Sequence, residues 1–199
     1  MAKSYNRKDH YYEKAKAVGY RSRAAYKLLE LQKKYSIIKT GQRVLDLGCW
    51  PGGWLQVSKK LVGNSGYVAG IDLKQIDQLS STVIRFYCGD VSDEALLKQT
   101  VTDAGSLFDV VLSDMAPKLT GIKEADRAAV EGIAEIAFWA AEKTLKPGGN
   151  FVVKVFKSNE INEFYRNIHT RFDKCLRKEL SSSRKTSNEF YLIGLGFKK

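Results

Sequence analysis

One lysine of this chain stands where a charged side chain is costly to bury. Lys154 lies inside the apolar run FVVKVF at residues 151–156. A lysine in such a run is unfavourable unless its ammonium is paired or has a function. The alternative is a lysine whose stem lies along apolar surface while its ammonium reaches solvent. A lysine held in place by its surroundings can take or orient a proton on a substrate hydroxyl.

A glycine-rich segment provides a second set of candidate residues. Residues 46–54 read DLGCWPGGW and follow a short apolar run that starts at Arg43. Glycines let the backbone turn tightly and approach a ligand closely, and the next helix would point unpaired N–H groups at that ligand. The spacing is G-x-x-x-G-G and not the dinucleotide pattern G-x-G-x-x-G, which disfavours NAD and FAD.

Carboxylates end three successive apolar runs. Asp46 precedes the glycine segment, Asp72 ends the next run, and Asp90 ends the third. An acid at the end of the second strand can accept both ribose hydroxyls of an adenosine, and Asp90 can accept a hydrogen bond from the adenine amino group. A single aspartate of this kind is most often a turn residue. Three of them beside a glycine loop predict a ligand with an adenosine end and a cationic end, which S-adenosylmethionine has.

The elements that must position these residues alternate along the chain. Apolar runs predict strands over residues 43–48, 67–73, 83–90, 108–117 (with a loop at its end), 150–156, 174–180 and 189–197. Helical spacing predicts helices over 21–35 (capped by Ser22), 54–62, 93–104, 125–145 and 160–171, the fourth stopped by KPGG at 146–149.

Alternating strands and helices predict a parallel sheet with helices on both faces. Residues 181–188 are too few for a crossover helix, so the last two strands should be antiparallel. The expected fold class is therefore α/β: a seven-stranded, mostly parallel sheet with one antiparallel strand. This is the Rossmann-like layout of class I S-adenosylmethionine-dependent methyltransferases. The length of 199 residues fits a single domain, 1–199.

Positive charge gathers near the two ends of the chain. The formal net charge is +11; residues 1–34 hold ten Lys and Arg against three acids, and residues 166–185 hold seven against two. The middle of the chain is nearly neutral. This split favours a polyanion partner such as RNA over a merely solvated surface. We expect 1–34 to be a basic helical segment that contributes to RNA binding.

Several classes of protein are disfavoured by the composition. No apolar run approaches the ~18 residues of a membrane span, and the N-terminus lacks the apolar stretch of a signal peptide. Three scattered cysteines and two histidines indicate neither a disulfide framework nor a metal site. We therefore expect a cytoplasmic protein without membrane association or bound metal, and a monomer.

Together, the motifs RSRAAYKL, DLGCWPGGW, SDMAP, KPGGNFVVKVF and SRKTSNEFYL resemble the FtsJ/RrmJ family of ribosomal RNA ribose 2′-O-methyltransferases. The resemblance covers about residues 11–196. It implies a Lys-Asp-Lys-Glu catalytic tetrad at Lys27, Asp114, Lys154 and Glu189. Cys49 and Trp50 stand where related loops often carry small residues. The expected cofactor-binding residues are Asp46, Gly48, Pro51, Gly52, Gly53, Trp54, Asp72, Asp90 and Asp114.

The resemblance also implies a reaction: methylation of a ribose 2′-hydroxyl, typically of a uridine in 23S-type large-subunit ribosomal RNA on the assembled particle, with S-adenosylmethionine as donor. In this hypothesis Lys154 takes or orients the hydroxyl proton, Asp114 positions Lys154 and the methyl group, and Lys27 and Glu189 fix the ribose. The alternatives are the same chemistry on transfer RNA and a non-catalytic RNA-binding scaffold. A methyltransferase for small molecules or proteins, and a nucleotide-dependent oxidoreductase, are disfavoured by the charge split and the glycine spacing.

The basic residues expected to contact RNA lie in both charged segments. Tyr11, Tyr12 and Tyr20 are interleaved with the first group, and either stack on bases or pack the segment onto the domain. The expected contacts are Lys3, Arg7, Lys8, Lys14, Arg21 and Arg23 in the first segment and Arg184 and Lys185 in the second.

Overall fold

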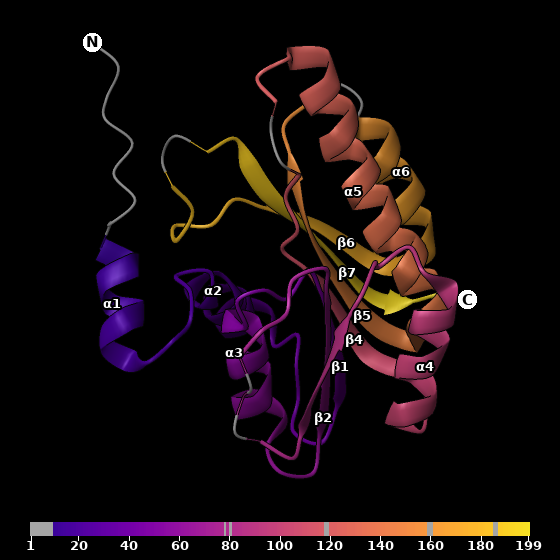
Figure 1. The fold of residues 1–199 in the computed structure, drawn as a ribbon. Coiled ribbons are helices and arrows are strands. Elements are labelled where there is room, and N and C mark those ends of the chain that lie inside the picture. The colour runs from indigo at the N-terminus through magenta and orange to yellow at the C-terminus, as the bar shows by residue number, and fades with distance from the viewer. Residues whose placement is uncertain (1–9, 78, 80, 118–119, 159–160, 185–186) are drawn as a thin grey trace.

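In the part of the chain that the structure describes, the fold contains seven strands and six helices, arranged as Figure 1 shows. The computed structural model describes residues 10–77, 79, 81–117, 120–158, 161–184 and 187–199, apart from the side chains of 123, 124 and 127. The strands are β1 (Arg43–Leu47), β2 (Tyr67–Asp72), β3 (Ile84–Cys88), β4 (Phe108–Ser113), β5 (Leu145–Phe156), β6 (Phe172–Lys178) and β7 (Glu189–Phe197). The helices are α1 (His10–Val18), α2 (Ala25–Tyr35), α3 (Gly53–Val62), α4 (Glu94–Ala104), α5 (Lys123–Thr144) and α6 (Ile161–Arg171).

The strands form one sheet in the order β3-β2-β1-β4-β5-β7-β6. β7 runs antiparallel to both of its neighbours, β5 and β6, while the pairs formed by β1–β5 are parallel. The expected α/β fold class, with seven strands and one antiparallel strand, is confirmed. Because the order reverses between β1 and β4, the carboxyl ends of these strands border a crevice at the switch point, where α/β folds bind ligands.

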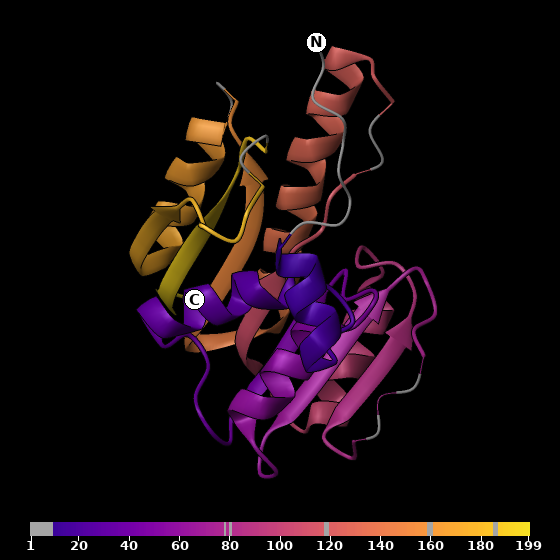
Figure 2. The ribbon, with the colours of Figure 1, turned by 90° about the vertical axis from the view of Figure 1, so that its left-hand side faces the viewer.

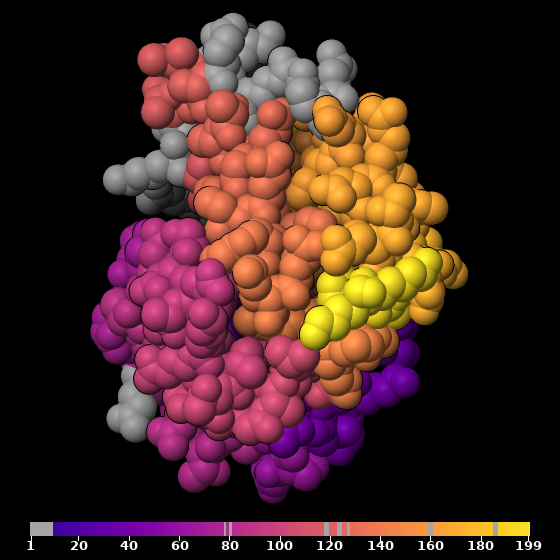
Figure 3. Space-filling model, turned by 90° about the vertical axis from the view of Figure 1, so that its right-hand side faces the viewer, coloured from indigo at the N-terminus to yellow at the C-terminus, as the bar shows by residue number. Residues whose placement is uncertain are grey.

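Helices cover both faces of the sheet. α1, α2 and α3 lie on the face turned to the viewer in Figure 2, and α4, α5 and α6 lie on the opposite face, which Figure 3 shows in space-filling form. Each face has its own apolar core. Leu28, Leu55 and Val110 belong to the core under α2 and α3, and Phe138, Phe151 and Phe172 belong to the core under α5 and α6.

Some predicted boundaries differ from the structure. α2 begins at Ala25 and not at residue 21, and its N-cap residue is Ala24, which makes no side-chain capping hydrogen bond. The predicted cap by Ser22 is therefore wrong; the Ser22 side chain instead packs so closely on Gly53 that a Cβ there would overlap its hydroxyl. α5 ends at Thr144, one residue before its predicted end. The predicted start of the next strand at residue 150 is wrong, because β5 begins at Leu145 and includes residues 146–149; it pairs regularly with β4 only after an irregularity near Phe108.

Strand alternation explains how the sheet presents polar groups to α2. Successive side chains of a strand point to opposite faces. On β5, Val152 belongs to the core under α2 and Val153 to the opposite core, so Lys154 points toward α2. Side chains two residues apart share a face, and Leu112 and Tyr191 both belong to the core under α2. Asp114, two residues after Leu112, and Glu189, two residues before Tyr191, therefore lie on the α2 face as well. Three neighbouring strands thus bring charged groups to one face at one end of the sheet.

Two further properties follow from the described part of the chain. No helix within it is both long and apolar enough to span a membrane. Among the same residues, no cluster of three or more His, Cys, Asp or Glu side chains is arranged to hold a metal ion.

Two glycine-to-alanine changes should have opposite effects on stability. A Cβ at Gly194 of β7 would lie 2.6 Å from the Phe172 ring, so Gly194→Ala should lower the free energy of unfolding by about 1–3 kcal/mol. Gly132 lies within α5 with nothing within 4 Å of an added Cβ, so Gly132→Ala should raise it by about 0.5–1 kcal/mol. Urea denaturation of both variants measures these changes. If both variants were stabilised, or both destabilised, the packing described here would be contradicted.

Candidate active site

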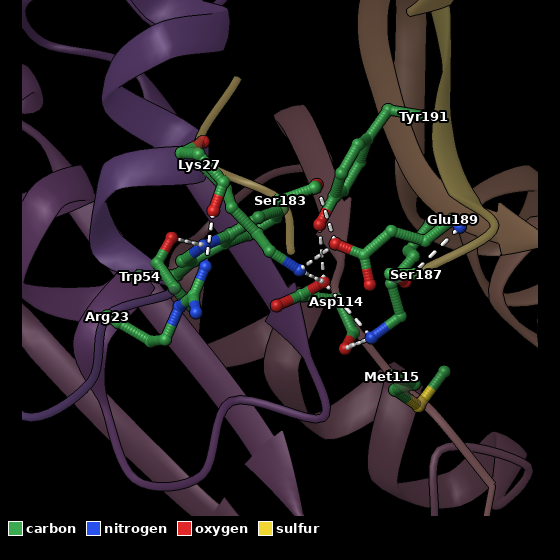
Figure 4. Close-up of polar contacts among 12 residues, drawn as sticks. Arg23, Lys27, Trp54, Asp114, Met115, Ser183, Ser187, Glu189 and Tyr191 are labelled. Carbon is green, nitrogen blue, oxygen red and sulfur yellow. Dashed lines mark hydrogen bonds and ion pairs between the residues drawn. The ribbon is translucent and has the colours of Figure 1, made fainter. Parts of the chain in front are cut away.

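Charged side chains from four elements meet at one end of the sheet. Lys27 Nζ lies 2.6 Å from Glu189 Oε1 and 3.6 Å from Asp114 Oδ1. Lys154 Nζ lies 3.1 Å from the same Asp114 oxygen and donates a 2.6 Å hydrogen bond to the Asp114 backbone carbonyl. Figure 4 shows Lys27, Asp114 and Glu189 pointing toward one another. The structure therefore brings together all four residues of the predicted tetrad.

The strand register fixes the spacing of these groups. Ser113 of β4 pairs with Val153 of β5, so Asp114 and Lys154 are adjacent just beyond that pair. On the other side of β5, Phe156 pairs with Glu189, the first residue of β7. Lys27 comes from the first turn of α2, which lies over this face of the sheet. Residues far apart in the sequence are thus held by a hydrogen-bonded ladder and one packed helix.

The four charges compensate one another in a largely buried place. Lys27 is 8% exposed and Lys154 is 7% exposed. Burial by itself raises the pKa of the Asp114 carboxyl, but the ammoniums of Lys154 and Lys27 outweigh it and hold that pKa below its usual range. Burial acts in the same direction on Glu189, and the Lys27 ammonium again lowers its pKa. Both carboxylates therefore stay ionised beside the two lysines at neutral pH.

Tyr191 is a part of the site that the sequence analysis missed. Its hydroxyl donates a 2.6 Å hydrogen bond to Asp114 Oδ1, so this oxygen faces two ammoniums and one phenol (Figure 4). Burial, followed by the nearby charge of Asp114, raises the pKa of Tyr191 well above its ordinary value. Its place two residues after Glu189 on the same strand face was the available clue.

A cavity opens beside the tetrad. Its volume is about 460 Å³, and Asp114 belongs both to its wall and to the tetrad. Four of the predicted cofactor-binding residues line it: Gly48, Asp72, Asp90 and Asp114. The sequence analysis did not predict cofactor contacts for the other lining residues, which are mostly apolar. They are Trp50, Leu73, Lys74, Gly89, Val91, Met115, Ala116, Ile133 and Ile136.

Backbone and serine groups orient the carboxylates of this cavity. Asp72 accepts 2.8 Å hydrogen bonds from the N–H groups of Trp50 and Lys74, one on each carboxylate oxygen. Asp90 accepts on Oδ1 from both the backbone N–H and the hydroxyl of Ser92, each at 2.8 Å, and these bonds lower the pKa of Asp90. The bonds fix both carboxylates against the cavity wall.

The remaining residues of the glycine segment lie behind the cavity wall. Gly52 leaves room for the Arg21 side chain, which an added Cβ would approach to 3.2 Å, and Gly53 packs on Ser22. Trp54 is buried; its indole N–H donates a 2.7 Å hydrogen bond to Ala24 O. Pro51, Gly52, Gly53 and Trp54 are not among the lining residues, and their cofactor contacts stay a prediction.

Asp46 is the most enclosed carboxylate of the site. The residue is 1% exposed, and within the described part of the chain its Oδ2 has no hydrogen-bond partner. Burial, reinforced by the charges of Asp114 and Asp72, raises the pKa of Asp46 well above its usual range. This environment therefore favours the neutral, protonated form of the Asp46 carboxyl over the ionised one.

Comparisons with known proteins agree with this geometry. Residues 20–197 match the model of the FtsJ-like methyltransferase family. The chain belongs to this family. It is 42% identical over 196 residues to ribosomal RNA large subunit methyltransferase E of Syntrophobacter fumaroxidans, covering 98% of this chain and 99% of the relative. It is also 42% identical to the protein of the same name from Desulfatibacillum aliphaticivorans, covering 94% and 89%.

A solved structure shows the same relationship. The crystal structure of a Plasmodium falciparum protein described as a ribosomal RNA methyltransferase matches with a TM-score of 0.76 at 28% identity. The match covers 89% of this chain and 98% of that one. The predicted family and fold class are thus confirmed, and methyltransferases of this kind in general use S-adenosylmethionine.

In this FtsJ-like chain, the N-terminal tyrosines pack against cations and against one another. Lys14 Nζ lies 5.0 Å from the centre of the Tyr26 ring, and Arg23 Cζ lies 5.8 Å from that of Tyr11. Tyr26 also contacts the rings of Tyr11 and Tyr20, at centroid distances of 5.5 and 6.0 Å. For Tyr11 and Tyr20, the structure supports the packing interpretation. Tyr12 is more exposed, at 39%.

Two of the predicted RNA-binding arginines hold loops next to the site. Arg21 Nη1 donates hydrogen bonds to Asp77 O at 2.7 Å and to Pro51 O at 3.3 Å. Arg23 Nη2 donates a 2.5 Å hydrogen bond to Ser182 O. The predicted RNA contacts Lys3, Arg7, Lys8 and Lys185 lie outside the described residues.

The neutral Asp46 gives a pH-dependent prediction. An unfolded aspartate ionises near pH ~3.9. Folded Asp46 keeps its proton above that pH, so the native state binds more protons than the unfolded state and its stability falls as pH rises. Asp46→Asn cannot titrate, so its stability relative to the wild type should increase as pH rises above the unfolded value. Urea denaturation of both proteins at a series of pH values above that point tests it, and a constant difference would contradict a raised pKa of Asp46.

Proposed function

We propose that this protein transfers a methyl group from S-adenosylmethionine to the 2′-hydroxyl of a ribose in large-subunit ribosomal RNA, at a uridine. The observation that carries the proposal is that Asp114 belongs both to the cavity wall and to the group of four charged residues. This residue lines the 460 Å³ cavity, and its carboxylate lies 3.1 Å from Lys154 Nζ. A methyl donor in the cavity and a hydroxyl beside Lys154 would therefore meet at this carboxylate.

The residues of the cavity fit S-adenosylmethionine. Asp72 and Asp90 are suited to the ribose hydroxyls and the adenine amino group, while Val91, Ile133 and Ile136 offer an apolar wall for the base. Gly48 lines the cavity and has no side chain, which leaves the space beside its Cα to Met115, another lining residue. The ionised carboxylate of Asp114 suits a cationic sulfonium. When bound, S-adenosylmethionine supplies an electrophilic methyl group.

The chain's own residues would prepare the acceptor hydroxyl. Lys154 Nζ is fixed by the carbonyl and the carboxylate of Asp114, and it takes or orients the hydroxyl proton during attack. Lys27 and Glu189, joined at 2.6 Å, hold the ribose from the α2 side. Alignment of the hydroxyl behind the methyl carbon supplies a large share of the acceleration, because methyl transfer is an in-line displacement.

The proposed substrate rests on charge and on relatives. Relatives 42% identical over nearly the whole chain are named large-subunit ribosomal RNA methyltransferases. The net charge of +11 suits a phosphate backbone. Lys14 and Arg23 belong to the α1–α2 segment, which leads directly to Lys27, so RNA bound there would lie next to the tetrad.

Replacing Lys154 should remove turnover while leaving cofactor binding intact. Lys154→Ala is expected to lower kcat by about 10²–10⁴-fold, because proton transfer or hydroxyl orientation is lost. Lys157→Ala is the matched control: Lys157 lies three residues further on, just past the end of β5, and its side chain is 56% exposed and ion-paired with Glu179. The measurement is single-turnover transfer of labelled methyl groups, with calorimetric titration of S-adenosylmethionine in parallel.

The same assay decides the substrate. Ribosomal subunits, naked ribosomal RNA and transfer RNA are offered separately, and the 2′-O-methyl nucleotide is mapped. Label in a large-subunit ribosomal RNA uridine is the expected result. Label only in transfer RNA, or in protein, would overturn the substrate proposal, and wild-type turnover by Lys154→Ala would overturn the role of Lys154.

RNA binding should depend steeply on salt. Affinity for a ribosomal RNA fragment is expected to fall by about 10- to 100-fold between about 50 and 200 mM salt, because each neutralised phosphate releases counterions. Lys14→Ala should make this dependence shallower, while Lys98→Ala, an exposed lysine of α4 on the opposite face, should not. Fluorescence anisotropy at a series of salt concentrations measures both, and a flat response would contradict phosphate contacts.

A further inference from the structure

Glu30 makes the densest set of side-chain hydrogen bonds between α2 and the loop that connects β6 to β7. Its Oε1 accepts from the Ser181 N–H at 2.9 Å. Its Oε2 accepts from the Ser181 hydroxyl at 2.9 Å, the Ser182 N–H at 3.0 Å and the Ser182 hydroxyl at 2.9 Å. Burial alone would raise the pKa of Glu30, but these four bonds lower it, so the carboxylate is ionised and the bonds are charge-assisted.

Arg23 holds the same loop from a second direction. Its Nη2 donates a 2.5 Å hydrogen bond to the Ser182 carbonyl, while Glu30 accepts from the Ser182 N–H. Ser182 is 1% exposed, so its backbone is enclosed as well as bonded on both sides. Residues 181 and 182 are thereby fixed to α2 and its N-terminal turn.

The fixed loop leads directly to the tetrad. Ser183 follows and donates a 2.6 Å hydrogen bond from its hydroxyl to Glu189 Oε1, the oxygen that also accepts from Lys27 Nζ (Figure 4). Lys27 and Glu30 are three residues apart on α2, and residues with this spacing are neighbours on a helix surface. One helix surface therefore provides both the cation that contacts Glu189 and the anion that holds the loop contacting Glu189.

We infer that Glu30 is a positioning residue of the active site: through residues 181–183 it sets the place of the Glu189 carboxylate opposite Lys27. This inference rests on the proposed function. Glu30 itself does not reach substrate or cofactor in this arrangement. Its effect on turnover passes through Ser183 and Glu189, because they form the chain of bonds from Glu30 to the tetrad.

The test compares turnover in three variants with that of the wild type. Glu30→Ala is expected to lower kcat by about 10- to 100-fold without changing KM for S-adenosylmethionine, since a small displacement of one active-site group has an effect of this size. Glu30→Gln should lie between Glu30→Ala and the wild type, because it keeps one acceptor oxygen. Glu94→Ala is the matched control; Glu94 is a half-exposed glutamate of α4 paired with Lys98 and Lys143.

A double-mutant comparison separates positioning from general destabilisation. In a Glu189→Gln background, Glu30→Ala should lower kcat little further, because both changes act through the same carboxylate. Equal losses in the two backgrounds, or a kcat for Glu30→Ala within about twofold of the wild type, would overturn the inference.

Two controls keep the result interpretable. If Glu30→Ala does not fold, as judged by its melting transition, Ser183→Ala removes only the hydroxyl next to Glu189 and should lower kcat by about 10-fold. Unchanged turnover in Ser183→Ala would then overturn the inference. If the wild type methylates no RNA, the proposed function fails; an active wild type with an equally active, folded Glu30→Ala contradicts only the role of Glu30.

Discussion

The carboxylate of Asp114 is the constraint on which the rest of the site depends. Two lysines 7–8% exposed would be strongly disfavoured without a nearby anion, and Asp114 contacts both of them. In return the lysines keep Asp114 ionised in spite of its burial. The four charged side chains stabilise one another, and removing any one charge would weaken the compensation of its partners. The strands and the helix that carry these side chains must therefore place them within contact distance.

The order of the strands in the sheet brings these side chains together. β5 lies between β4 and β7, so residues that follow β4, lie within β5 and begin β7 are neighbours at one end of the sheet. The antiparallel direction of β7 matters here, because it places the start of that strand, and not its end, beside the carboxyl end of β5. If β7 ran parallel to β5, Glu189 would lie at the opposite end of the strands.

The sequence allowed the fold and most of the site to be predicted for identifiable reasons. Lys154 stood out because its run is otherwise apolar, and Asp46, Asp72 and Asp90 stood out because each ended an apolar run. The roles of Lys27, Asp114 and Glu189 were implied by the family resemblance. Tyr191 and Glu30 could not be found in this way, because an apolar-looking tyrosine and a helix-surface glutamate are unremarkable locally. Their roles arise from contacts with residues 77 and about 150 positions away, which only the assembled sheet brings near.

The basic N-terminal segment shows why net charge alone describes a site poorly. Arg21 and Arg23, which charge patterning assigns to RNA, are bonded to carbonyls of the loops around Pro51 and Ser182. These bonds give both arginines a structural role beside the cavity and the Glu189 loop, which charge patterning alone does not reveal. The turn before α2 therefore helps to shape the site through hydrogen bonds to backbone carbonyls, and not only through its charge.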